Sequence, residues 1–237
     1  MTEELASSAH LATIGKAHVF VSSVLQPQLG TEDRHHLERV LRLGPNEIIT
    51  VSDGLGHWRC CQLRSGDLLP MDEVVHVVST PKPIGIAVSL LKGDRTEWVV
   101  QKLVEIGIDR ITLLETERTI VHWPADKRQR QLDRLRKVAR EAAMQSRQPF
   151  LAIVDGPRML ADLAGLPGVA LAHHTGGRLD DGTSTLVVGP EGGWSQTERD
   201  LFSKTVTLGS SNLRAETAAV FGAALLVAVR TRVVVWT

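Results

Sequence analysis

The amino-acid sequence predicts an α/β protein with two domains, a β-rich domain over residues 1–80 and a second domain over residues 81–237. Short strand-like runs separated by turn residues continue to Thr80, a pattern typical of a small β-barrel or sandwich. The segment Thr80-Pro81-Lys82-Pro83 follows, and its two prolines suit a stiff linker. Strands and helices then alternate, which indicates a mostly parallel sheet covered on both faces.

The first domain is predicted to contain one helix and four strands. Residues 1–16 are small and polar, and we expect a frayed leader there. The helix is expected at Arg34–Leu41, and Asp53-Gly54-Leu55-Gly56 has the composition of a hairpin turn. The predicted strands are His18–Val24, Glu47–Ser52, His57–Arg64 and Val74–Ser79.

The second domain is predicted to alternate six strands with helices. Amphipathic helices are expected at Thr96–Ile106 and Ala125–Gln145. Ser195-Gln196-Thr197-Glu198 is a capping box, so a further helix should begin near Gln196. The predicted strands are Ile86–Leu91, Ile111–Leu114, Leu151–Val154, Val169–Ala172, Thr185–Val188 and Val206–Leu208.

Composition excludes several classes of protein. The net charge is zero, so any nucleic-acid affinity must come from local patches. The longest apolar run, Ala218–Val229, falls short of the roughly 20 residues of a membrane span, and no signal segment is seen, so we expect a cytoplasmic protein. Cys60 and Cys61 are expected to be reduced, buried thiols on opposite faces of a strand. The histidines lack metal-type spacing, and no metal is expected.

Two strand–loop–helix segments predict one cofactor site. They are Val187-Val188-Gly189-Pro190-Glu191-Gly192-Gly193-Trp194-Ser195 and Leu208-Gly209-Ser210-Ser211-Asn212-Leu213-Arg214-Ala215-Glu216-Thr217-Ala218. Glycine, without a Cβ, lets main-chain groups contact a ligand directly. Neither the phosphate-cradling Gly-x-x-x-x-Gly-Lys-Ser/Thr nor a strand-to-helix Gly-x-Gly-x-x-Gly is present, so the site is not of a standard nucleotide type.

These two segments resemble the signature of the RsmE family, SPOUT-class methyltransferases that move a methyl group from S-adenosylmethionine to N3 of a uridine in 16S rRNA. Further family-like segments, in the expected order, include Lys92-Gly93-Asp94-Arg95 and the run from Glu141 to Arg147. The resemblance implies a PUA-like β-barrel as first domain, a trefoil-knotted SPOUT methyltransferase domain as second, and a homodimer. The sequence departs from the family at Ser211-Asn212, where Pro-Arg is usual, and at Ala215, where Thr is usual.

The resemblance also implies roles for individual residues. The cofactor contacts would be Val188, Gly189, Gly192, Gly193, Leu208, Gly209, Asn212, Leu213 and Thr217. Methylation at N3 requires loss of its proton, and a fixed guanidinium would stabilise the uracil anion; Arg214 is the candidate. Glu191 or Glu216 would accept the proton or orient Arg214, and the sequence does not choose between them. Alternatively, Arg214 and Glu216 form an ion pair at the start of a helix.

RNA contacts are expected from basic and polar residues outside the two loops, because phosphate binding uses positive charge whatever the base sequence. The expected contacts are Arg34, His36, Arg39, Arg42, Lys92, Arg95, Gln145 and Arg147. The basic residues from Lys127 to Arg140 are interpreted as a solvated helix face. Small residues from Ala218 to Ala224 indicate tight packing of the last helix, either in the core or, as the family implies, at a dimer interface.

Two other functions stay open from the sequence. One is a noncatalytic RNA-binding protein on a degenerate methyltransferase fold, motivated by Asn212 and Ala215. The other is a related enzyme that acts on tRNA or 23S rRNA. The partner would be 16S rRNA, either free or within an assembled small ribosomal subunit.

Overall fold

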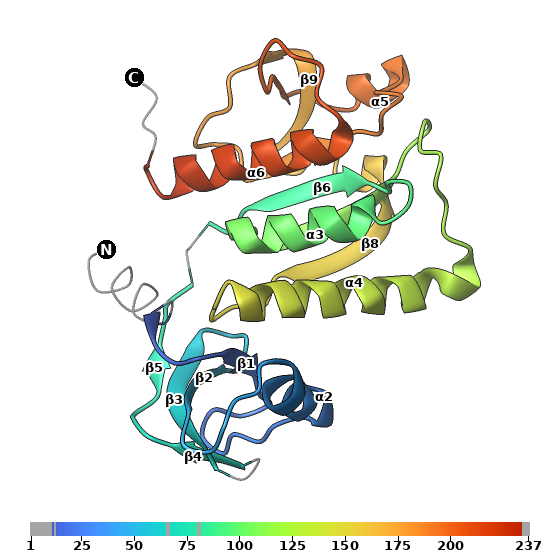
Figure 1. Ribbon diagram of the computed structural model, residues 1–237. Helices are drawn as coiled ribbons and strands as arrows, with labels where there is room; N and C mark the ends of the chain where they lie inside the picture. The colour runs from blue at the N-terminus through green and yellow to red at the C-terminus, as the bar shows by residue number, and fades with distance from the viewer. Residues whose placement is uncertain (1–10, 12, 65–66, 80–81, 234–237) are drawn as a thin grey trace. The chain divides into compact units, whose positions relative to one another are not determined.

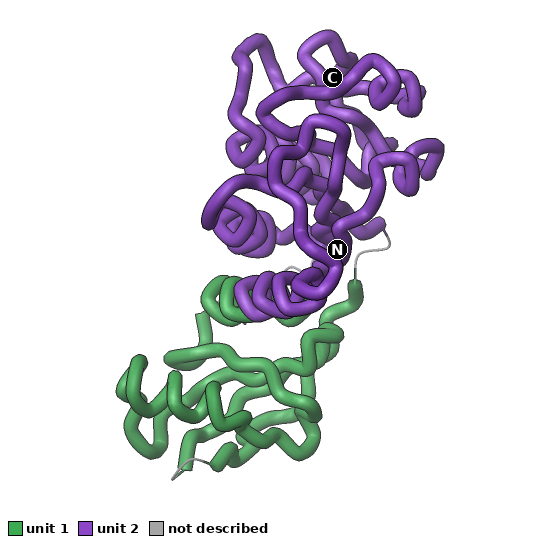
Figure 2. The backbone as a smooth tube through the Cα atoms, turned by 90° about the vertical axis from the view of Figure 1, so that its right-hand side faces the viewer, with its two compact units in different colours: residues 1–81, 140–151 green, residues 82–139, 152–237 purple. Residues whose placement is uncertain are grey.

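The computed structural model describes residue 11 and residues 13–64, 67–79 and 82–233 (Figure 1). The chain divides into two compact units, one of residues 1–81 and 140–151 and the other of residues 82–139 and 152–237 (Figure 2). The first unit therefore includes a segment that the sequence assigned to the second domain. The contacts of this segment explain the difference: Arg140 forms two hydrogen bonds of 2.8 Å to the Asp33 carboxylate, and Met144 packs against the core of the first unit.

One five-stranded sheet forms the centre of the first unit, in the order β1-β2-β3-β4 with β5 also paired to β3. The strands are β1 (His18–Phe20), β2 (Ile48–Ser52), β3 (His57–Arg64), β4 (Asp67–Pro70) and β5 (Val75–His76). β1 is parallel to β2, and the other pairs are antiparallel. The predicted hairpin turn between β2 and β3 is confirmed. Among the described strands the pairing ends at β1 and β4, so closure into a barrel stays a prediction.

Several local predictions for the first unit were wrong. Leu11 is fully buried in a cluster with Trp58, so the chain is packed rather than frayed there; most of the expected leader, residues 1–10 and 12, lies outside the described residues. The expected helix at residues 34–41 begins earlier, as α2 (Thr31–His35), and continues as the π-helical turn η1 (His36–Val40). β1 and β5 are both shorter than expected, and β4 was not expected at all.

The two adjacent cysteines lie on opposite faces of β3, as predicted. Cys61 belongs to the cluster around Val19 and Ile49, whereas Cys60 belongs to the cluster around Trp58. Both are free and buried. Burial, followed by the contact with Asp72, raises the pKa of the Cys60 thiol to about 12, so this sulfur stays protonated.

The second unit is built on a six-stranded sheet in the order β11-β9-β10-β6-β7-β8. All five pairings are parallel, which confirms the prediction from strand–helix alternation. The strands are β6 (Gly85–Ser89), β7 (Arg110–Glu115), β8 (Ile153–Met159), β9 (Val169–Gly177), β10 (Thr185–Val188) and β11 (Thr205–Val206). The helices are α3 (Arg95–Ile106), α4 (Ala125–Gln145), η2 (Leu160–Asp162), α5 (Gln196–Asp200) and α6 (Ala215–Arg230).

Both faces of this sheet are covered. α6 packs on β6 and β10 and on its neighbour α3 (Figure 1). A Cβ at Gly222 would collide with the Leu186 side chain, and Ala219 and Ala223 are buried, so part of the small-residue run in α6 does serve core packing. On the other face, Leu160, Leu163, Trp194 and Phe202 belong to one cluster with the strand residues Ala87, Leu171 and Val187.

No helix in the described residues has both the length and the apolar character that a membrane crossing requires. The same part of the chain contains no group of three His, Cys, Asp or Glu side chains arranged to hold a metal ion.

His18 is a buried, neutral histidine in the first unit. Its Nε2 donates to the Gln148 carbonyl at 3.2 Å, which leaves Nδ1 to accept from the Thr50 hydroxyl at 2.9 Å. Burial, reinforced by the charges of Arg147 and Arg140, lowers the pKa of the ring from 6.5 to about 4 despite the opposing bond to Gln148. Between about pH 4 and pH 6.5, the His18 ring therefore stays neutral in the folded unit but binds a proton in the unfolded chain.

Acidification should consequently destabilise the first unit. Above pH 6.5 the ring is neutral in both the folded and the unfolded state, so the contribution of His18 to stability is greatest there. As the pH falls from 6.5 to about 4, only the unfolded chain binds the proton, and the free energy of unfolding decreases by on the order of 3 kcal/mol in total. Hydrogen exchange at the amides of β2 and β3 in the full chain measures it, after correction for intrinsic exchange rates. His18→Gln should flatten this pH dependence, and the exposed His36→Gln should not. An unchanged pH dependence in His18→Gln would contradict the assignment.

Candidate functional site

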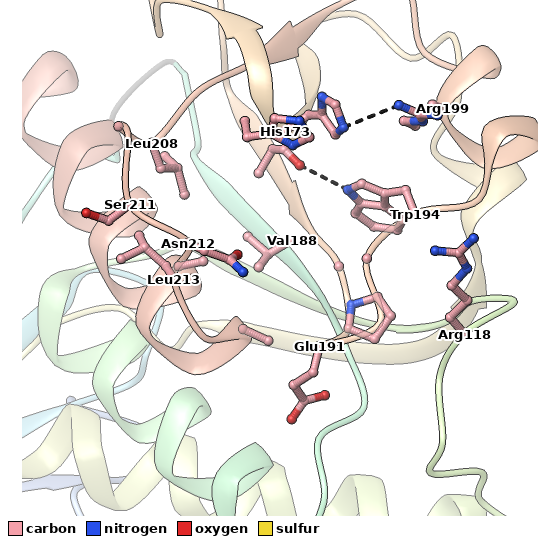
Figure 3. A pocket seen from close by; sticks show the side chains of 18 of the residues that line it. Arg118, His173, Val188, Glu191, Trp194, Arg199, Leu208, Ser211, Asn212 and Leu213 are labelled. Carbon is pink, nitrogen blue, oxygen red and sulfur yellow. Dashed lines mark hydrogen bonds between the residues drawn. The ribbon is translucent and has the colours of Figure 1, made fainter.

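Both glycine-bearing loops lie at the carboxyl edge of the parallel sheet. The first follows β10 and the second follows β11, and β9 is paired in parallel with both strands. Ligands in open α/β sheets bind at this edge. A cavity of about 820 Å³ opens between the loops, within the size range of small-molecule sites (Figure 3).

Most of the predicted cofactor residues line this cavity. They are Val188, Gly189, Gly193, Leu208, Gly209, Asn212 and Leu213. Gly192 and Thr217 are outside its wall. The Gly192 carbonyl accepts a 2.9 Å hydrogen bond from Arg118 Nη1, and Thr217 is exposed in the first turn of α6.

Tight packing shapes the first loop. A Cβ at Gly189 would stand 2.8 Å from Cε2 of the Trp194 ring, so only glycine lets the indole lie against this backbone. The indole Nε1 donates to the Ala172 carbonyl at 2.9 Å. The capping box is confirmed: the Ser195 hydroxyl accepts from the Glu198 amide at 3.1 Å, and the Glu198 carboxylate accepts from the Ser195 amide at 2.9 Å. The start of α5 thus fixes the end of the loop.

Two glycines are required for their backbone conformation. Gly193 has φ +68° and Gly209 has φ +116°, values at which a side chain is strained. A Cβ at either position would meet no atom within 4 Å. In each of the two loops, main-chain atoms are therefore unobstructed at a glycine.

Arg95 joins the two loop segments through their carboxylates. Its Nη1 is 2.7 Å from Glu191 Oε1 in the first loop and 3.6 Å from Glu216 Oε2 in the first turn of α6. The Glu216 Oε2 atom is buried and accepts no hydrogen bond. Arg95 was expected to contact RNA, but its charge is engaged here by two acidic groups.

Arg214 is the N-cap residue of α6 and is exposed. The alternative in which it pairs with Glu216 does not occur, because Glu216 faces Arg95. Within the described part of the chain, Arg214 makes no ion pair and no side-chain hydrogen bond, so its donors are free. It does not line the cavity, although Leu213 and Ala215 on either side of it do.

Sequence reasoning missed five large side chains in the cavity wall: Arg118, His173, His174, Trp194 and Arg199. His173 and His174 belong to the part of β9 beyond its predicted end at Ala172. Arg118 lies just after β7, and the rule that ligands bind at the carboxyl ends of parallel strands would have indicated it. Burial, then the charges of His174 and Arg199, lowers the pKa of His173.

The predicted RNA-contacting residues divide into free and engaged groups. His36, Arg39 and Arg42 are exposed on η1 and just after it, and no partner for their side chains occurs among the described residues. Arg34 is 3.9 Å from Asp67 in an exposed ion pair. Lys92 and Gln145 are exposed. The Arg147 guanidinium is occupied, because its Nη2 donates to the Gly15 carbonyl at 2.8 Å and its Nη1 to that of Ile14.

Comparison with known proteins identifies relatives of both units. An RNA methyltransferase domain model matches residues 78–227, and an RNA methyltransferase PUA domain model matches residues 29–67. Ribosomal RNA small subunit methyltransferase E of Synechocystis sp. is 32% identical over 80% of this chain and 69% of its own length. The Bacillus subtilis protein of that name is 27% identical over 80% of this chain and 85% of its own.

Solved structures of the same fold include two with a bound cofactor. A putative methyltransferase of Legionella pneumophila in complex with SAM has a TM-score of 0.78 and 25% identity, covering 88% of this chain and 96% of that one. Ribosomal RNA small subunit methyltransferase E of Neisseria gonorrhoeae, bound to S-adenosyl methionine, has a TM-score of 0.76 and 27% identity, covering 89% and 96%.

Replacing Gly189 should disturb the cavity through Trp194. In Gly189→Ala the new methyl group would overlap the indole, and we expect the free energy of unfolding to fall by roughly 1–3 kcal/mol. Urea denaturation measures this. Gly177→Ala is the matched control, because its Cβ would be 3.8 Å from the nearest atom, Thr205 O. Equal stability of the two variants would mean that the indole does not depend on Gly189.

Proposed function

The chain belongs to the ribosomal RNA small subunit methyltransferase E family, and we propose that it transfers the methyl group of S-adenosylmethionine to N3 of one uridine in 16S rRNA. The observation that carries this proposal is the cavity between the two glycine-bearing loops at the carboxyl edge of the parallel sheet. Two relatives with this fold hold the same methyl donor.

The residues present fit a bound S-adenosylmethionine. Gly193 and Gly209 leave space that a Cβ would fill, so their main chain is accessible to a ligand. Leu208, Leu213 and Val188 supply apolar wall on one side of the cavity, where the adenine would lie against backbone groups (Figure 3). The donor supplies an activated methyl group on a sulfonium.

The remaining task of the protein is to prepare the nucleophile. Glu191 or Glu216 would accept the N3 proton, so that the N3 lone pair becomes available to the activated methyl group that bound S-adenosylmethionine would supply. Glu191 lines the cavity, and Glu216 has an oxygen that accepts no hydrogen bond. Arg214 has free donors, and its guanidinium would stabilise the negative charge on the uracil carbonyl oxygens.

The two units have different roles in this proposal, and the protein is a homodimer. The first compact unit is the PUA-like barrel that binds RNA, and the second compact unit is the methyltransferase domain, whose C-terminal part is threaded into a trefoil knot. The protein acts in the cytoplasm as a homodimer on 16S rRNA or the small ribosomal subunit. Trp98 on α3 and Phe221 on α6 support the dimer, because they leave apolar surface exposed on two helices that pack together, at 44% and 43%.

A noncatalytic RNA-binding role is the second candidate, because Asn212 and Ala215, two positions where the sequence departs from the family, both line the cavity. Calorimetry with S-adenosylmethionine separates the two functions, and no binding at millimolar cofactor by the folded protein would favour the second. Mass spectrometry of rRNA from cells with and without the protein then tests the substrate. Loss of a methyl group from a tRNA or 23S rRNA nucleotide instead would overturn the assignment to 16S rRNA.

Arg214→Lys should slow methyl transfer far more than it weakens cofactor binding. Lysine keeps the charge but loses the planar fork, and loss of one such positioned donor costs on the order of 3 kcal/mol, or roughly a hundredfold in rate. Single-turnover methylation at saturating cofactor, over a range of pH, measures the step. Arg178→Lys, at an exposed position outside the cavity wall, is the control. Normal turnover by the Arg214 variant would show that another residue stabilises the uracil anion.

Arg39→Ala and Arg42→Ala should weaken RNA binding and leave cofactor affinity unchanged. Removal of one phosphate-binding charge should reduce the dependence of log affinity on log salt by about one. Titration of labelled rRNA fragments at several salt concentrations gives these slopes. Arg64→Ala, at an exposed arginine of the same unit, controls for the loss of one charge. Parallel loss of RNA and cofactor affinity would show that Arg39 and Arg42 hold the fold instead.

A further inference from the structure

One side of the cavity carries positive charge that no carboxylate of the described residues neutralises. Arg118, Arg199, His173 and His174 line it, and Figure 3 shows Arg118 and Arg199 on the side away from Leu208 and Leu213. The acidic side chain in the wall, Glu191, is paired with Arg95 at 2.7 Å. Two guanidinium groups therefore line the cavity without a carboxylate partner among the described residues.

Arg118 is held in place by the backbone of the first loop. Its Nη1 donates to the Gly192 carbonyl at 2.9 Å, and its Cβ is 3.3 Å from where a Cβ of Gly192 would stand. No ion pair of Arg118 occurs among the described residues. The remaining donors of the guanidinium are thus fixed in position and available to a ligand.

Arg199 is oriented by neighbours that do not neutralise it. Its Nη2 donates to the Gln196 side-chain oxygen, and its Nη1 is 3.5 Å from His173 Nε2. Its Nε atom is buried and has no hydrogen-bond acceptor among the described residues. Nη1 and Nη2 each carry a second N–H, and Arg199 lines the cavity, so donors of this guanidinium group remain for a ligand.

We propose that Arg118 and Arg199 form a subsite for a phosphodiester group of the RNA next to the target uridine. The inference rests on the proposed function. N3 lies on the pairing edge of uracil, so the nucleotide must leave any helix to reach the methyl group, and its flanking phosphates then need a fixed position. Guanidinium forks match phosphate oxygens in geometry and charge. The main chain of the two glycine-bearing loops is left to hold the cofactor.

The test removes charge from each partner in turn. Oligonucleotides that carry the target uridine are made with a single uncharged methylphosphonate at each flanking linkage. Their affinities are measured for the wild type, Arg118→Gln, Arg199→Gln and the control Arg178→Gln, at an exposed arginine of the same unit outside the cavity wall. We expect one linkage at which the methylphosphonate weakens wild-type binding about tenfold, the size of one charged hydrogen bond. The two cavity variants should bind the unmodified RNA about tenfold more weakly and be insensitive to that substitution.

Two results would overturn the subsite. One is an equal loss in Arg178→Gln, which would mean that any arginine of this unit acts through general charge. The other is a loss of S-adenosylhomocysteine affinity in the cavity variants as large as the loss for RNA, which would assign the arginines to the cofactor carboxylate. Failure of the proposed function is distinguishable, because the RNA measurements need no cofactor. If the wild type binds no S-adenosylmethionine but still shows the linkage-specific effect, the proposed methyltransferase activity is wrong and the proposed phosphate subsite is supported.

Discussion

The parallel pairing of β9 with both β10 and β11 is the constraint on which the site depends. Since parallel strands end at the same edge, this pairing delivers the loop after β10 and the loop after β11 to one place. Gly176 makes the arrangement sterically possible, because a Cβ there would stand 2.6 Å from Val206 Cα in β11. The meeting of the two loops, with their accessible main chain, follows from that close approach.

Charge is distributed around the cavity in two different ways. Arg95 is placed between Glu191 and Glu216, so it links the first loop to the start of α6 and leaves a net negative charge on the three groups. Arg118 and Arg199 line the cavity and Arg214 lies at the N-terminus of α6, and none of the three has a carboxylate partner in the part of the chain that the structure describes. A reaction between a cationic methyl donor and a polyanionic RNA calls for both environments, and this separation keeps the acidic groups from neutralising the arginines.

The compact units do not follow the linear order of the chain. α4 begins in the second unit, but its last residues and those up to Leu151 belong to the first. Arg140 bonds to Asp33, and the Gln148 carbonyl accepts from the buried His18 ring. A single domain boundary at the proline-containing linker does not account for the return of residues 140–151 to the first unit. The hydrophobic pattern of an amphipathic helix does not show which of two cores its last turn packs against.

The sequence by itself determined much of the local structure of both units and the location of the two loops. The bounds of α4, β3 and β10 were predicted correctly, because hydrophobic periodicity and turn residues act over a few neighbours. The capping box around Ser195 and the hairpin turn after β2 are local in the same way. Membership of the family also followed from two short segments with a characteristic order of residues.

Only the tertiary structure decided which side chains share the cavity and which charges are free. Arg95 and Arg147 have the same sequence-level character as Arg39 and Arg42, yet the first pair is engaged and the second is exposed. Arg118 and Arg199 are 81 positions apart and meet at the cavity through the order of the strands. Ion pairing depends on distance in space, and a sequence carries that distance only through its fold.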